Sequence, residues 1–80
     1  SVKDAPLGEP VTLAVRVTAH RPSPYARAKA PYRVLVEDDT GDVTLVFFGL
    51  PARRVESMLP IGSRRLVSGT IELYDGHRQM

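Results

Sequence analysis

The sequence lacks cysteine and tryptophan, and it contains only two histidines, His20 and His77. Without thiols the chain has no disulfide and no cysteine-based metal site, and two distant histidines do not make a zinc ligand set. The missing cysteine fits a reducing compartment. No apolar run approaches the roughly 20 residues that cross a membrane, so we expect no membrane partner.

Acidic residues are also missing between Glu9 and Glu37, although the net charge of the 80 residues is only +2. Within this interval, residues 20–33 combine basic residues, tyrosines and three prolines, and prolines are excluded from helix and sheet interiors. Long loops in small domains are often functional. Interleaved basic and aromatic side chains suit a partner with phosphates and bases. The candidate nucleic-acid-binding residues are therefore Arg21, Tyr25, Arg27, Lys29, Tyr32 and Arg33.

Acids instead gather immediately after this segment, at Glu37, Asp38, Asp39 and Asp42. Aspartate is an ordinary turn residue, and the cluster lacks the longer loop and distal ligand of an EF-hand. No serine stands in a nucleophile-elbow pattern. We therefore expect no metal site, no catalytic residue and no enzymatic activity in this chain.

The length predicts one domain over residues 10–80, after a lead-in or linker at 1–9. Apolar residues alternate with polar ones through 10–20, which predicts a long half-buried strand of the kind shared between two parts of a barrel. Further strands are predicted at 32–38, 43–48, 64–74 and from 77, with hairpin turns at 39–42 and 75–76 and a short helix that Pro51 begins and Pro60 ends. Gly69 predicts a bend or a close backbone approach.

This order predicts an all-β OB-fold: a five-stranded antiparallel Greek-key barrel with one short helix between its third and fourth strands. An SH3-like barrel is the alternative, but it does not need the helix. The OB-fold offers its second and third strands and their flanking loops to oligonucleotides or oligosaccharides. Oligosaccharide binding is less favoured, since the chain has no tryptophan or asparagine. A purely structural or protein-interaction module is another alternative, with Leu35 and Phe48 as contacts to neighbouring domains.

Several runs of residues carry a family resemblance, and the first is 32–41, which ends in an Asp-x-Thr-Gly hairpin made by Asp38, Thr40 and Gly41 and shared with other OB-fold nucleic-acid proteins. An apolar strand that ends in Phe47 and Phe48 follows it, and residues 59–62 and 67–69 extend the similarity over about residues 10–80. The chain resembles the wedge domain of RecG, the ATP-dependent DNA helicase that remodels stalled forks and branched junctions.

The resemblance implies binding of fork or Holliday-type junctions, at single-stranded/duplex boundaries. It implies that Tyr25 takes the place of the loop aromatic that stacks on an exposed base, and that Arg27 and Lys29 contact backbone phosphates. Tyr32 is a second candidate for stacking, or else a core residue. A general single-stranded nucleic-acid-binding domain is the alternative.

The resemblance also implies a larger parent protein, whose helicase motor domains would bind ATP and Mg²⁺ and adjoin this domain. That protein would act in the bacterial cytoplasm, on the nucleoid, in replication-fork rescue, recombination and DNA repair. No Gly-x-x-x-x-Gly-Lys-[Ser/Thr] motif occurs in the chain, so no cofactor is expected in this fragment.

Overall fold

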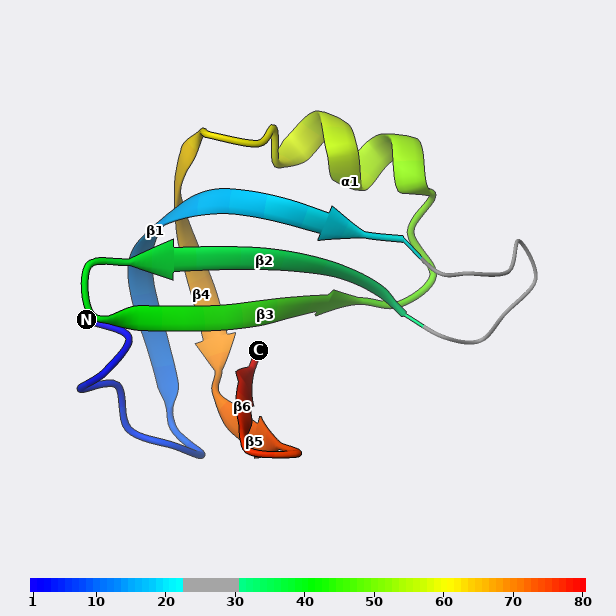
Figure 1. Ribbon diagram of the computed structural model, residues 1–80. Helices are drawn as coiled ribbons and strands as arrows, with labels where there is room; N and C mark the ends of the chain where they lie inside the picture. The colour runs from blue at the N-terminus through cyan, green and yellow to red at the C-terminus, as the bar shows by residue number, and fades with distance from the viewer. Residues whose placement is uncertain (23–30) are drawn as a thin grey trace.

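The computed structural model describes residues 1–22 and 31–80, which form one strongly curved sheet and a short helix (Figure 1). Its elements in chain order are β1 (Pro10–Arg21), β2 (Tyr32–Asp38), β3 (Gly41–Phe47), α1 (Ala52–Met58), β4 (Arg64–Thr70), β5 (Glu72–Tyr74) and β6 (His77–Gln79). The prediction of a mainly β fold with one short helix between the third and fourth strands is confirmed.

The first strand is long because its alternating apolar residues keep one face buried along its whole course. Leu13, Val15 and Val17 are buried while their neighbours are exposed. The N-terminal part of β1 pairs with β4, and the C-terminal part pairs with β2 beyond Arg16. A register shift between Val17 and Ala19 marks a bulge, which increases local twist. The expected sharing of this strand between two parts of the sheet is thus confirmed.

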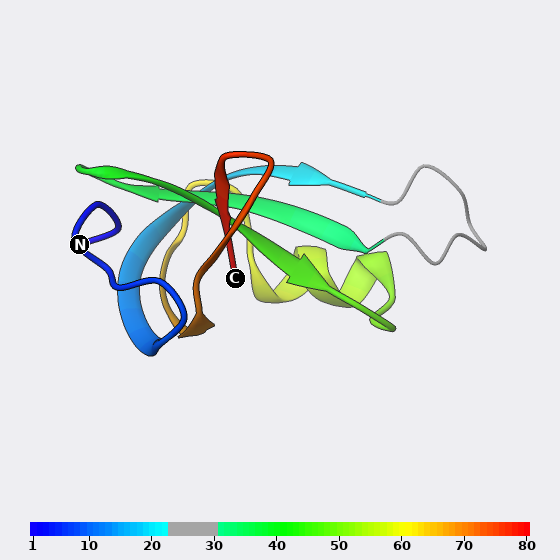
Figure 2. The same cartoon turned by 90° about the horizontal axis from the view of Figure 1, so that it is seen from below.

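The sheet itself differs from the expected barrel. Its strand order is β4-β1-β2-β3-β6-β5, and β6 runs parallel to β3, where the Met80 N–H donates to the Thr44 carbonyl at 2.8 Å. Figure 2 shows the β5–β6 hairpin lying against β3. The prediction of a closed, five-stranded, all-antiparallel barrel is therefore wrong: the described residues form an open, mixed sheet of six strands.

The extra strand arises because residues 64–74, expected as one strand, divide at Ile71. Ile71 is fully buried and makes an isolated bridge with Leu7, while β4 pairs with β1 and β5 pairs with β6. Alternating hydrophobicity predicts a strand but does not say which neighbour it pairs with. At Gly69 the close neighbour is a side chain and not another backbone, since a Cβ atom there would lie 2.8 Å from Met80 Cγ.

The hydrophobic core lies on the inner face of the curved sheet and is closed by α1. Val55 and Leu59 reach it from the helix and its C-terminal end, and Val2 reaches it from the segment before β1. Pro51, expected at the first helical position, is instead the N-cap residue, and the helix begins one residue later at Ala52. Within the described residues, no helix is long and apolar enough to cross a membrane.

Candidate nucleic-acid interface

Two arginines face one another where β1 ends and β2 begins, which we call the loop end of the sheet. Arg21 and Arg33 are direct partners in the antiparallel register, and both are exposed. Directly opposed side chains share a face, with Cβ atoms about 4.5–5.5 Å apart, and like charges so placed repel. The one ion pair among residues 1–22 and 31–80 joins Arg16 to Glu37. An anion bound between Arg21 and Arg33 would remove their repulsion.

An exposed aromatic residue lies at the same end of the sheet. Arg33 is opposite Val46 in β3, and Phe48 follows two residues later, 71% exposed. Phe47 is half-buried and packs against the core. The sequence suggested Phe48 as a contact to neighbouring domains, and its exposed ring also allows stacking on a base. The signals that point outward are strict alternation with Phe47 and the strand break at Gly49, which has a positive φ of 72°.

Tyr32 is placed in the core, the alternative that the sequence also allowed. It is 5% exposed, and its ring meets His20 edge-on at 5.6 Å. Its hydroxyl lies 2.7 Å from His20 Nδ1 and 3.3 Å from Glu56 Oε1. Burial, and then the negative charge of Glu56, raise the pKa of Tyr32 above its usual value of 10.

His20 completes this network from β1, because its Nε2 lies 2.7 Å from the Leu59 carbonyl oxygen. The carbonyl only accepts, so Nε2 donates a hydrogen to it. The Tyr32 hydroxyl donates its one hydrogen to Glu56 Oε1, and its oxygen lies next to His20 Nδ1. His20 and Tyr32 immediately flank the segment that contains the candidate loop residues. Their bonds to Leu59 and Glu56 therefore fix both ends of that segment against α1.

The remaining candidates, Tyr25, Arg27 and Lys29, lie outside the described residues. Of the six residues that the sequence singled out, the structure thus brings Arg21 and Arg33 together on the outer face and places Tyr32 beneath them. Leu35, considered as a contact to neighbouring domains, is half-buried between Ala19 and Thr44.

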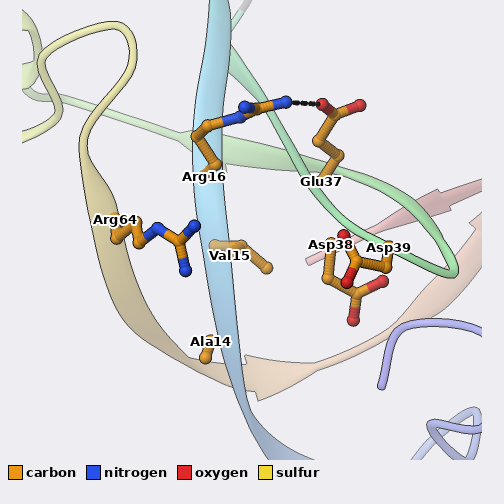
Figure 3. A pocket seen from close by; sticks show the side chains of 7 residues that line it. All are labelled: Ala14, Val15, Arg16, Glu37, Asp38, Asp39 and Arg64. Atoms are coloured by element: carbon orange, nitrogen blue, oxygen red, sulfur yellow. Dashed lines mark hydrogen bonds and ion pairs between the residues drawn. The ribbon is translucent and has the colours of Figure 1, made fainter.

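The opposite end of β2, which we call the turn end, holds the acidic cluster beside a pocket of about 230 Å³. Arg16 Nη2 donates to Glu37 Oε1 at 2.6 Å, and Arg64 approaches from the β4 side (Figure 3). The pocket is lined by Ala14, Val15, Arg16, Glu37, Asp38, Asp39 and Arg64. No group of three or more metal-ligating side chains occurs in the described part of the chain.

Asp38 uses its carboxylate to build the turn. Its Oδ1 accepts bonds from the Thr40 hydroxyl (2.6 Å), the Thr40 N–H (2.7 Å) and the Gly41 N–H (3.1 Å). Its Oδ2 accepts from the Val2 N–H at 2.7 Å. The Thr40 hydroxyl above all, helped by the three N–H groups, lowers the pKa of Asp38 to about 2. At least one member of the acidic cluster, Asp38, therefore stabilises the hairpin turn.

The chain belongs to the family described as OB-fold nucleic acid binding domain, whose model matches residues 11–80. No significant match was found among curated proteins or among solved structures. The chain is therefore an OB-fold nucleic-acid-binding domain, and the expected class of partner, DNA or RNA, is supported.

Proposed function

We propose that this domain is the branched-DNA-binding wedge of a RecG-type helicase. The resemblance of residues 10–80 to that wedge supports the choice of branched DNA, and the family supports nucleic acid as the partner. The observation that carries the proposal is the exposed cross-strand pair Arg21 and Arg33 at the base of the basic segment.

In this proposal a backbone phosphate lies between Arg21 and Arg33. Each guanidinium presents a planar array of donors that matches phosphate oxygens, and charge-assisted bonds of this kind are about twice as strong as neutral ones. Arg27 and Lys29 extend the phosphate contacts along the strand. Tyr25 and Phe48 offer ring faces to unpaired bases at the junction. Because phosphates and ring faces carry little sequence information, binding is selective for structure and tolerant of sequence.

We further propose that the chemistry of the parent protein lies outside this domain. Motor domains of the same parent chain would bind ATP and Mg²⁺ and supply movement along DNA, while the wedge binds the branch point. The biological setting would be replication-fork rescue, recombination and DNA repair in the bacterial cytoplasm.

The proposal is tested by fluorescence anisotropy with a labelled three-way junction and a duplex of matched sequence. We expect tighter binding of the junction, and a loss of about tenfold or more in Arg21→Ala/Arg33→Ala, since bonds to charged groups contribute about 1.5–3 kcal/mol each. The salt slope should fall by about 0.9 for each phosphate contact removed. Arg27→Ala/Lys29→Ala tests the loop in the same way.

Arg53→Ala/Arg54→Ala is the matched control, since it removes two arginines from α1 and leaves the loop end intact. Equal affinity for junction and duplex would exclude the wedge function. Unchanged affinity in both the Arg21/Arg33 and the Arg27/Lys29 variants would exclude the loop end as the site.

General binding of single-stranded nucleic acid is the second candidate, and the exposed ring of Phe48 favours it. Stacking on an aromatic side chain needs an unpaired base but no branch point. Competition separates the two functions. If unlabelled oligothymidylate displaces the junction at the same concentration as unlabelled junction does, the domain is a general single-strand binder.

A further inference from the structure

The helix α1 is exposed on most of its surface. Val55 is its one buried residue, and no side chain caps its N-terminus. A helix of seven residues is unstable alone, so its few inward contacts must hold it in place. Those contacts include Val55, Leu59, the bonds that Glu56 and the Leu59 carbonyl make with Tyr32 and His20, and the bond that Arg65 Nε donates to the Met58 carbonyl at 3.3 Å.

One group of exposed apolar side chains lies on and beside this helix, and another lies in residues 66–74. Eight large apolar side chains are exposed in the described part of the chain, and four of them fall within residues 48–61. Phe48 lies at the loop end, whereas the other three flank α1 or lie in its last turn. These are Leu50, Met58 and Ile61, at 37%, 42% and 66% exposure. Concentrated apolar exposure of this kind marks interaction surfaces.

A groove runs along the same surface, lined by Pro51, Arg53, Arg54, Ser57 and Met58. Pro51, Arg54 and Met58 follow the i, i+3, i+7 spacing that places side chains on one helix face. The two arginines give this face a positive rim. Glu56, the single acidic residue of the helix, does not pair with these arginines. Its carboxylate accepts a hydrogen bond from the Tyr32 hydroxyl at 3.3 Å. The groove on the outer surface of α1 therefore has apolar side chains, Pro51 and Met58, beside the guanidinium groups of Arg53 and Arg54. Within the described residues, neither arginine forms an ion pair.

We propose that this surface docks an acidic segment of another protein. Carboxylates of the segment pair with Arg53 and Arg54, and an apolar side chain packs on Met58. The charge is complementary, which sets orientation and partner choice. Methionine is unbranched and adapts its shape, a property used at peptide-binding grooves. Nucleic acid fits this surface less well, because no aromatic residue lines the groove and bases stack on aromatic rings.

The inference goes beyond nucleic-acid binding and is tested separately from it. The probe is a short synthetic peptide in which leucine recurs at helical spacing among glutamates, titrated into the ¹⁵N-labelled 80-residue chain. We expect amide shift changes concentrated in residues 50–61. Binding should weaken by about tenfold or more in Arg53→Glu/Arg54→Glu and by several-fold in Met58→Ala. Met58→Leu should retain binding, and so should the matched charge reversal Arg64→Glu on β4.

Each variant is first checked for an unchanged spectrum away from α1, so that loss of folding is not mistaken for loss of docking. Shift changes at Arg21 and Arg33 in place of α1, no saturable binding, or unchanged affinity in the arginine variant would overturn the inference. Oligothymidylate that shifts residues 50–61 would also overturn it, because the surface would then belong to the nucleic-acid site. None of these peptide results bears on the proposed DNA binding, which only the junction titration tests.

Discussion

The two ends of strands β2 and β3 differ in the sign of their charges and in how those charges are partnered. At the turn end, Arg16 is paired with Glu37, and Asp38 accepts hydrogen bonds from the turn and from Val2. At the loop end, Arg21 and Arg33 oppose one another without an acidic partner among the described residues. Charges that are satisfied within the fold stabilise it, whereas opposed like charges cost stability unless a partner neutralises them.

The outer face of the sheet is therefore negatively charged at the turn end and positively charged at the loop end. Glu37, Asp39 and Asp42 repel phosphates at one end, while the arginines attract them at the other. We propose that, within one domain of small net charge, this separation of charge selects the end that binds nucleic acid.

The strongest way to break the contrast is to reverse the loop end with Arg21→Glu/Arg33→Glu. We expect junction affinity to fall by about 100-fold, since two attractive contacts become repulsive. Arg16→Ala, which removes a compensated charge from the same strand, should change affinity by less than about threefold. Fluorescence anisotropy at fixed salt measures both. Equal losses in the two variants would show that the ends do not differ.

At the turn end the corresponding change is Asp38→Ala, which should affect folding and leave binding intact. It removes the acceptor of the Val2, Thr40 and Gly41 bonds and leaves those donors without a protein partner. We expect a loss of about 2 kcal/mol in the free energy of unfolding, measured by urea denaturation. Asp38→Asn keeps an acceptor oxygen and should lose less. A weaker junction affinity at unchanged stability would contradict this division of roles.

Acid should affect the turn end in the same direction. The pKa of Asp38 is about 2 in the folded chain, below the usual value of 3.8. A lowered folded pKa contributes stability that is present above the unfolded pKa and is lost as the pH falls toward the folded one. The free energy of unfolding should therefore decrease between about pH 4 and pH 2. Asp38→Asn should decrease less over this interval; parallel curves would rule out Asp38 as the source.

Phe48→Ala sharpens the description of the loop end. Because the ring is exposed, its removal should leave stability unchanged within about 0.5 kcal/mol. Affinity for a single-stranded oligonucleotide should fall about tenfold, as expected from about 1–3 kcal/mol for each stacked base. Ile61→Ala, another exposed apolar truncation, is the control for nonspecific effects. An equal loss in both variants would mean that Phe48 is not a stacking platform.

The smallest effect is expected from Tyr32→Phe, which keeps the buried ring and removes the hydroxyl. His20 Nδ1 then loses its partner, and we expect about 1 kcal/mol less stability by urea denaturation. If stability is unchanged, the bonds to His20 and Glu56 do not tie the loop end to α1. His20→Ala probes the same network from β1.

Much of the local structure follows from the residues themselves. The alternation through 32–38 predicts β2 with its observed bounds, and Pro51 predicts the start of the helix to within one residue. Asp75 and Gly76 both adopt a positive φ in a two-residue hairpin, as their residue types predict. Glu37 and Arg16, by contrast, are 21 positions apart, and their ion pair depends on the β1–β2 register.

The amino-acid sequence by itself determined the strands, the turns, the helix and the basic segment, because each depends on nearest neighbours, side-chain periodicity and backbone preference. The tertiary structure alone decided that residues 64–74 divide between two edges of an open sheet and that Arg21 faces Arg33. These features depend on which strands pair and on which side of the sheet the core forms, and such long-range packing leaves no local pattern in the residues.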